Sequence, residues 1–143
     1  MGPDCDPDAL QNAARVALER MNQPDGSSVA ITLVDDATIR HLNEQYRGVD
    51  SVTDVLSFST QGGESFILPE EGQFELGDIV ISCDTAAGQA RRMGHACVEE
   101  LALLTIHGCL HLVGMDHGTD AEQQAMWQLQ DELLAELGYT LRS

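Results

Sequence analysis

The part of the sequence best suited to chemistry is a group of three histidines, His107, His111 and His117. Residues four apart lie on one face of a helix, so we expect the His107 and His111 imidazoles to project side by side. Gly114 stands where that helix should end, and a left-handed turn there can bring His117 back toward the other two. Three converging imidazoles suit Zn²⁺ with one coordination position left open. We therefore predict one zinc ion per chain.

The segment over residues 107–117 matches the metzincin protease motif H-E-x-x-H-x-x-G-x-x-H at every position but one. Gly108 stands where those proteases have a glutamate. A peptidase of this kind needs the carboxylate to take a proton from the attacking water, and glycine cannot do so. A metzincin-like zinc peptidase without its usual base is therefore an alternative hypothesis, and the less favoured one.

A purely structural zinc is the other alternative, because structural sites close with four protein ligands, often cysteines. Cys109 points to a different face of the helix from His107, and Cys97 lies about 15 Å away along the helix axis. Cys83, at the end of a strand, is the one plausible fourth ligand, and nothing in its spacing favours it. We therefore favour an open, catalytic zinc site.

The composition restricts the partners. Among 143 residues there are 24 Asp and Glu against 7 Arg and no Lys, which gives a net charge of −17. Such a surface repels phosphate backbones, so we expect weak, salt-sensitive binding to naked RNA and no DNA partner. The four cysteines show no paired spacing, which favours free thiols in a reducing cytoplasm. Without a long apolar stretch or a signal peptide, we expect no membrane partner.

The histidines must be positioned by the elements around them. Helical spacing of apolar residues and capping residues predict helices over residues 7–21, from a cap at 35 or 36 to about 46, from a cap at 84 to about 94, over 97–113 and over 119–138. Runs of β-branched residues predict strands over 28–34, 53–58 and 76–83, with a loop over 61–75. Because helices and strands do not strictly alternate, we predict an α+β fold with a mixed sheet, as a single domain over residues 1–143.

Taken in order, several segments resemble the YbeY family. They are Tyr46-Arg47-Gly48, residues 53–58, residues 76–81 and the H-G-x-L-H-L-x-G-x-D-H segment over 107–117. The resemblance runs from about residue 31 to residue 138. It implies a zincin-like fold, in which a mixed sheet packs against helices. It also implies a single-strand-specific, zinc-dependent endoribonuclease that acts in 16S rRNA 3′-end maturation, late assembly of the small ribosomal subunit and ribosome quality control. The expected partners are rRNA and ribosomal proteins; the third hypothesis is a zinc-stabilised module that only binds the ribosome.

The resemblance also assigns roles to individual residues. It makes His107, His111 and His117 the zinc ligands, with His107 counted in the catalytic centre, and it places Arg47 beside the metal cleft. A guanidinium can grip a phosphodiester through two hydrogen bonds and stabilise charge that develops on it. Without the resemblance, a salt bridge at a helix end would be the simpler interpretation of Arg47.

Other polar residues have weaker cases. Asp116 could orient an imidazole of the site, and surface solvation explains it equally well. Thr53 and Asp54 could line the cleft, or they could cap the end of a strand. We expect His95 in an ordinary surface or capping role, and Trp127 in the core rather than in an RNA-stacking platform.

Overall fold

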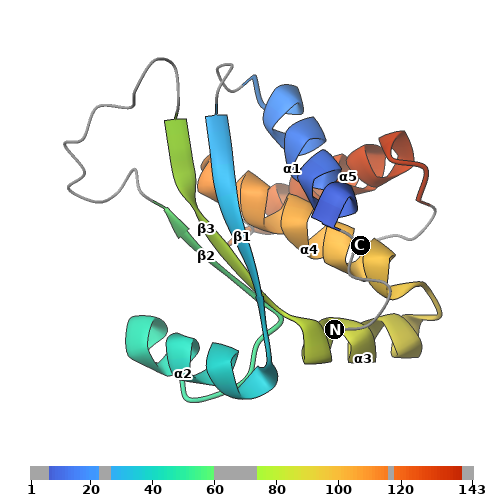
Figure 1. The fold of residues 1–143 in the computed structure, drawn as a ribbon. Helices are drawn as coiled ribbons and strands as arrows, with labels where there is room; N and C mark the ends of the chain where they lie inside the picture. Colours follow the sequence, from blue (N-terminus) through green and yellow to red (C-terminus); the bar gives the residue numbers. More distant parts are fainter. Residues whose placement is uncertain (1–6, 23–26, 60–73, 116–117, 140–143) are drawn as a thin grey trace.

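The computed structural model describes residues 7–22, 27–59, 74–115 and 118–139. Asp116 and His117, and most of the expected loop over 61–75, lie outside these ranges. The elements are α1 (Pro7–Arg20), β1 (Ser27–Val34), α2 (Asp36–Arg47), β2 (Val55–Ser59), β3 (Phe74–Ser82), α3 (Cys83–Met93), α4 (Cys97–Leu112) and α5 (Asp120–Glu136) (Figure 1). None of these helices is long and apolar enough to cross a membrane.

The three strands form one mixed sheet in the order β1-β3-β2. β1 pairs with β3 in parallel, and β2 pairs with β3 in antiparallel orientation, which confirms the predicted α+β fold with a mixed sheet. Side chains of a strand point alternately to the two faces of its sheet. In β3, Ile79 and Ile81 face one core and Val80 faces another, so the central strand is buried on both sides.

The helices divide between these two faces. α4 packs against β2 and β3, and α1 and α5 in turn pack against α4 (Figure 1). α2 lies on the other side, where Ile39 packs with Leu56 and Val80 in a smaller apolar cluster. The histidine-bearing helix therefore lies in the middle of the molecule, between the sheet and the outer helices.

Side-chain caps fix where several helices begin. Asp35 caps α2 by accepting a hydrogen bond from the Thr38 backbone N–H at 2.8 Å, as predicted for residue 35 or 36. The predicted capping box of Thr119 and Glu122 at the start of α5 is confirmed. The predicted cap at Asp84 is wrong. Because β3 runs directly into α3 without a loop, Ser82 takes that position instead.

One carboxylate joins the beginnings of α2 and α3. Asp36 accepts hydrogen bonds from the Ser82 hydroxyl at 2.6 Å and from the Thr85 hydroxyl at 2.7 Å. Its own backbone N–H donates to Asp84 at 3.2 Å. The hydrogen bonds from Ser82 and Thr85 lower the pKa of Asp36 below its ordinary value, because they stabilise the charged form. These contacts fix the start of α2, whose last turn carries Arg47.

The expectation that Trp127 lies in the core is wrong. The buried face of α5 consists of Met126, Gln130, Leu133 and Leu134. Trp127 follows Met126 by one residue, about 100° around the helix, so it leaves that face. Its side chain is 43% exposed.

Candidate active site

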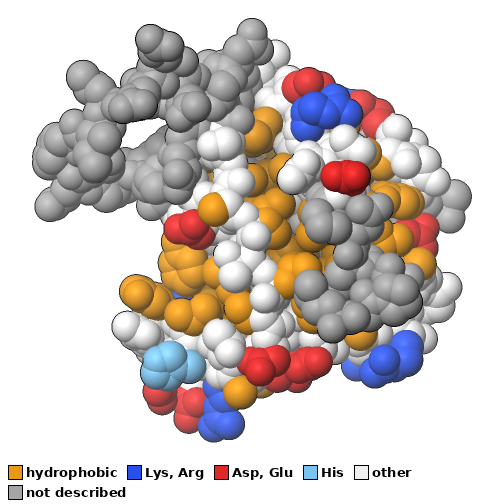
Figure 2. Space-filling view, viewed as in Figure 1, with side chains coloured by type: hydrophobic (Ala, Val, Ile, Leu, Met, Phe, Trp, Pro, Cys, Tyr) orange, Lys and Arg blue, Asp and Glu red, His pale blue; other side chains and the backbone are white. Residues whose placement is uncertain are grey.

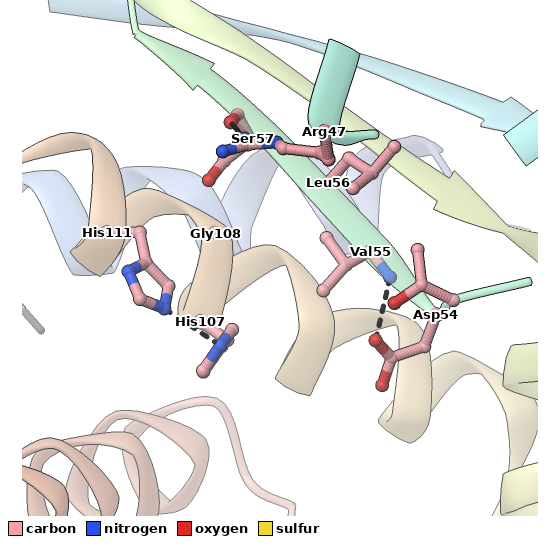
Figure 3. A pocket seen from close by; sticks show the side chains of 9 residues that line it. Arg47, Asp54, Val55, Leu56, Ser57, His107, Gly108 and His111 are labelled. Carbon is pink, nitrogen blue, oxygen red and sulfur yellow. Dashed lines mark hydrogen bonds between the residues drawn. The ribbon is translucent and has the colours of Figure 1, made fainter. Parts of the chain in front are cut away.

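Two of the predicted zinc ligands lie together on α4. The Nε2 atoms of His107 and His111 are 3.1 Å apart, and the ring centroids are 4.6 Å apart at an interplanar angle of 76°. Both side chains are half-buried and turn toward one another (Figure 3). The predicted juxtaposition of His107 and His111 on one helix face is therefore observed.

The separation of these two nitrogens suits a tetrahedral metal. Zn–N bonds of about 2.0–2.1 Å at tetrahedral angles place two ligand nitrogens about 3.3 Å apart. The observed 3.1 Å between the Nε2 atoms is close to that value. No three potential metal ligands are grouped within the described ranges, which do not include His117. The donor set fits zinc as far as it is described, and the third ligand stays a prediction.

The chain turns after His111 as the sequence predicts. α4 ends at Leu112, and Gly114 has a φ of 102°, in the region that favours glycine. The Met115 backbone N–H donates to the Leu110 carbonyl at 3.0 Å, which closes the end of the helix. Gly114 therefore ends the helix and changes the direction of the chain shortly before residue 117.

A buried glutamine, which the sequence analysis missed, holds one of the imidazoles. The Gln130 side chain on α5 is 2% exposed, and its Oε1 lies 2.7 Å from His107 Nδ1. Since an amide oxygen only accepts hydrogen bonds, this contact places the proton on Nδ1, and Nε2 then has a lone pair that can bind a metal. The signal in the sequence was a polar residue on the apolar face of α5.

Gly108 lies at the closest approach of α4 to the sheet. A Cβ atom at this position would lie 3.0–3.2 Å from side-chain atoms of Ile79, which is fully buried in β3. Glycine at the position of the protease glutamate therefore fits the packing, because a Cβ atom here would press against Ile79. A catalytic carboxylate at this position would require the Ile79 side chain to shift by a few tenths of an ångström.

The cysteines do not complete a metal site in the described structure. Cys83, Cys97 and Cys109 form no disulfide within the described residues, as predicted. Burial raises the pKa of Cys109 to about 12, so this thiol stays protonated at neutral pH. None of the three lines the pocket that contains His107 and His111. The proposed fourth ligand Cys83 therefore has no support from the geometry.

The two histidines line a pocket of about 340 Å³ between α4 and β2 (Figure 3). Residues distant in sequence meet there because α4 packs across β2, and because the end of α2 lies beside that strand. The lining residues are Arg47, Thr53, Asp54, Val55, Leu56, Ser57, His107, Gly108 and His111. Arg47, Thr53 and Asp54 thus lie in one pocket with His107 and His111.

Arg47 enters the pocket from the last turn of α2. Its Nη2 donates a hydrogen bond to the Ser57 carbonyl, and its guanidinium lies 5.2 Å from the centre of the Phe58 ring. Within the described ranges it makes no ion pair with a carboxylate, whereas Arg15, Arg20 and Arg40 do. The interpretation of Arg47 as one half of a helix-end salt bridge is therefore not supported, and its charge is available to a ligand.

Asp54 is held in place at the start of β2. One carboxylate oxygen accepts from the Val55 backbone N–H at 2.8 Å, and the other accepts from Gln89 Nε2 at 3.3 Å. It therefore both caps the strand and lines the pocket.

His95 lies outside the pocket. Its Nε2 is 2.6 Å from a carboxylate oxygen of Glu100, and both side chains are largely buried. The expectation of a surface role for His95 is therefore wrong. Its side chain contacts the first turn of α4, and its backbone N–H donates to the Ala90 carbonyl at the end of α3.

Comparison with known proteins identifies relatives of the chain. The family model described as "Endoribonuclease YbeY" matches residues 5–138. Proteins named Endoribonuclease YbeY from Desulforamulus reducens and Symbiobacterium thermophilum are 44% and 47% identical to it. Each alignment covers 90% of this chain, with 84% and 85% of the respective relative. The solution structure of TM1509 from Thermotoga maritima has a TM-score of 0.62 and 29% identity, covering 91% of this chain and 79% of that one. The chain belongs to the endoribonuclease YbeY family.

Proposed function

We propose that this protein is a zinc-dependent endoribonuclease that cleaves single-stranded RNA in the cytoplasm. Its substrate is the 3′ end of 16S rRNA during late assembly and quality control of the small ribosomal subunit, where ribosomal proteins are its partners. Family membership supports cleavage of RNA. The observation that carries the proposal is one pocket that combines two close imidazoles with Arg47, which pairs with no carboxylate among the described residues.

In this proposal, His107 and His111 hold the zinc ion through their Nε2 atoms, together with His117. The ion, when bound, supplies Lewis-acid polarisation of a phosphate oxygen and makes water more acidic. Gln130 holds the proton on Nδ1 of His107, which keeps Nε2 available as a ligand. The burial of Gln130 excludes water from this hydrogen bond and so keeps the imidazole in one orientation.

Arg47 positions the scissile phosphate. Its guanidinium is anchored by the Ser57 carbonyl and the Phe58 ring on β2, and it lines the same pocket as the two imidazoles. Anchoring of this kind lowers the entropy that is lost when the side chain grips a ligand. A preorganised cation beside a reacting phosphate stabilises charge that increases toward the transition state.

The described residues support neither a peptidase nor a purely structural zinc site. A metzincin-like peptidase would need a carboxylate at position 108, where the sequence has Gly108 and where a Cβ atom would already lie 3.0–3.2 Å from Ile79 side-chain atoms. A zinc that only stabilises the fold would close with a fourth protein ligand, and neither Cys83, Cys97 nor Cys109 lines the pocket.

The decisive experiment incubates the zinc-loaded protein with a 16S rRNA 3′ precursor, single-stranded or annealed to its complement, and with a peptide library in parallel. We expect cleavage of the single strand alone, its loss with a chelator and its return with zinc. Elemental analysis should give one zinc per chain for the wild type and much less for His111→Ala. Peptide cleavage, or RNA cleavage that persists in metal-free protein, would contradict the proposal.

A further inference from the structure

A second pocket adjoins the one that contains the histidine pair. Its volume is about 420 Å³, and its lining residues are Tyr46, Arg47, Ser57, Phe58, His111 and Leu112. Arg47, Ser57 and His111 line both pockets. A ligand whose phosphate contacts Arg47 in the first pocket therefore extends directly into the second.

Two aromatic rings form one wall of this second pocket. The centroids of Tyr46 and Phe58 are 5.3 Å apart, with an interplanar angle of 65°. Phe58 is half-buried and packs against the small apolar cluster of Ile39, Leu56 and Val80, which fixes it in place. Tyr46, by contrast, is 60% exposed. The exposed ring of Tyr46 therefore packs against the half-buried ring of Phe58. Both rings line the same pocket as Arg47 and His111.

The charge of the protein makes an aromatic contact with RNA more important. The net charge is −17, and Arg15, Arg20 and Arg40 are already paired with carboxylates. On the face drawn in Figure 2, basic side chains occur in small separate groups rather than in one patch. Attraction of the phosphate backbone, the usual source of affinity for RNA, is therefore weak here. Stacking on an aromatic ring needs no net positive charge, and every base offers a face for it.

We propose that Tyr46 and Phe58, with the guanidinium of Arg47, form a stacking subsite for the nucleobase next to the scissile phosphate. This inference rests on the proposed function, since it assumes an RNA substrate. Arg47 lies between the two pockets, so the same residue contacts the phosphate on one side and borders the base on the other. A base in a duplex is stacked and paired, so only a single strand can place a base against Tyr46. The subsite thereby gives a physical reason for single-strand specificity.

The test measures binding and cleavage of a short single-stranded RNA by Tyr46→Ala, Tyr46→Phe and Trp127→Ala. Loss of one base–aromatic stack weakens binding by about 5- to 150-fold, which we expect for Tyr46→Ala. Tyr46→Phe should stay within about twofold of wild type because it keeps the ring. Trp127→Ala is the matched control, since Trp127 is also an exposed aromatic residue and lines neither pocket. The dependence of binding on salt should be unchanged in Tyr46→Ala, because no phosphate contact is lost.

A scan with abasic RNA locates the base. One abasic position beside the cleavage point should weaken binding to the wild type as much as Tyr46→Ala does, and should have no further effect in that variant. If the wild type cleaves RNA and Tyr46→Ala binds and cleaves it equally well, the subsite is overturned and the proposed function stands. The subsite is also overturned if, at every abasic position, the loss of RNA binding adds in full to the loss caused by Tyr46→Ala. If the wild type neither binds nor cleaves single-stranded RNA, the proposed function fails, and the subsite fails with it.

Discussion

Replacing Gln130 by methionine tests whether Gln130 holds His107 in the form that the proposed zinc site needs. The substitution nearly conserves volume inside α5 and removes the acceptor that lies 2.7 Å from His107 Nδ1. The Nδ1–H of His107 then loses this acceptor, and an unsatisfied buried donor costs about 1–3 kcal/mol. The imidazole can avoid that cost by moving its proton to Nε2, and Nε2 then ceases to be a ligand. The penalty should therefore appear mainly in zinc binding.

The expected loss of zinc affinity is about 10- to 100-fold, the usual effect of removing a hydrogen-bond partner of a metal-bound histidine. This range equals about 1.4–2.8 kcal/mol, which agrees with the cost of the unpaired N–H. Competition with a chelator of known affinity measures it. In the metal-free protein, the ¹⁵N shifts of the His107 ring should show the proton on Nδ1 in wild type and a shift toward Nε2 in Gln130→Met.

Two further variants separate positioning from folding. Gln124→Met makes the same chemical change at an exposed site of α5 and should bind zinc like wild type. Gln130→Glu keeps an acceptor and should retain zinc affinity, because a carboxylate partner makes the imidazole more basic. If Gln130→Met binds zinc as tightly as wild type while its His107 proton stays on Nδ1, the reasoning is refuted.

Three other predictions concern different parts of the structure. Arg47→Ala should lower the rate of RNA cleavage by about 10²–10³-fold with little change in melting temperature, whereas Arg40→Ala on the same helix should cleave normally. In Gly108→Ala, the contact with Ile79 should cost about 1–3 kcal/mol of the free energy of unfolding, and the higher helix propensity of alanine should return about 1 kcal/mol. Unfolding in urea should therefore show a net loss of up to about 2 kcal/mol. Asp36 has a lowered pKa, so its stabilisation is complete above the ordinary value of 3.8 and is lost as the pH falls through the lower folded value. The melting temperature should therefore fall less steeply with decreasing pH in Asp36→Asn than in the wild type. An equal slope in the two proteins would contradict this.

Local signals predicted much of the fold correctly. The capping box at Thr119 and Glu122 and the left-handed glycine at 114 each depend on a few neighbouring residues, and both are observed. The cap of α3 was misplaced because Asp84 and Ser82 are both good capping residues. The choice between them depends on where β3 ends, and its pairing with β1 and β2 determines that end.

The site was only partly predictable. His107 and His111 follow from a spacing of four residues within one helix, so the sequence placed them together. The contact between His107 and Gln130 joins two helices, and it depends on how α5 packs against α4. The reason for Gly108 was equally hidden, because Ile79 comes from a strand 29 residues earlier in the chain. Contacts of this kind depend on tertiary packing and leave little trace in local patterns.

The hydrogen bond from Arg47 to the Ser57 carbonyl also affects how the molecule meets its own copies. In the described part of the chain β2 is an edge strand, and such strands can pair with strands of other molecules and start aggregation. The guanidinium occupies one outward carbonyl of that edge and places a positive charge beside it. A strand of another molecule would have to displace this hydrogen bond and place its own backbone beside a positive charge. The side chain that lines the histidine pocket therefore also protects one edge of the sheet from self-association.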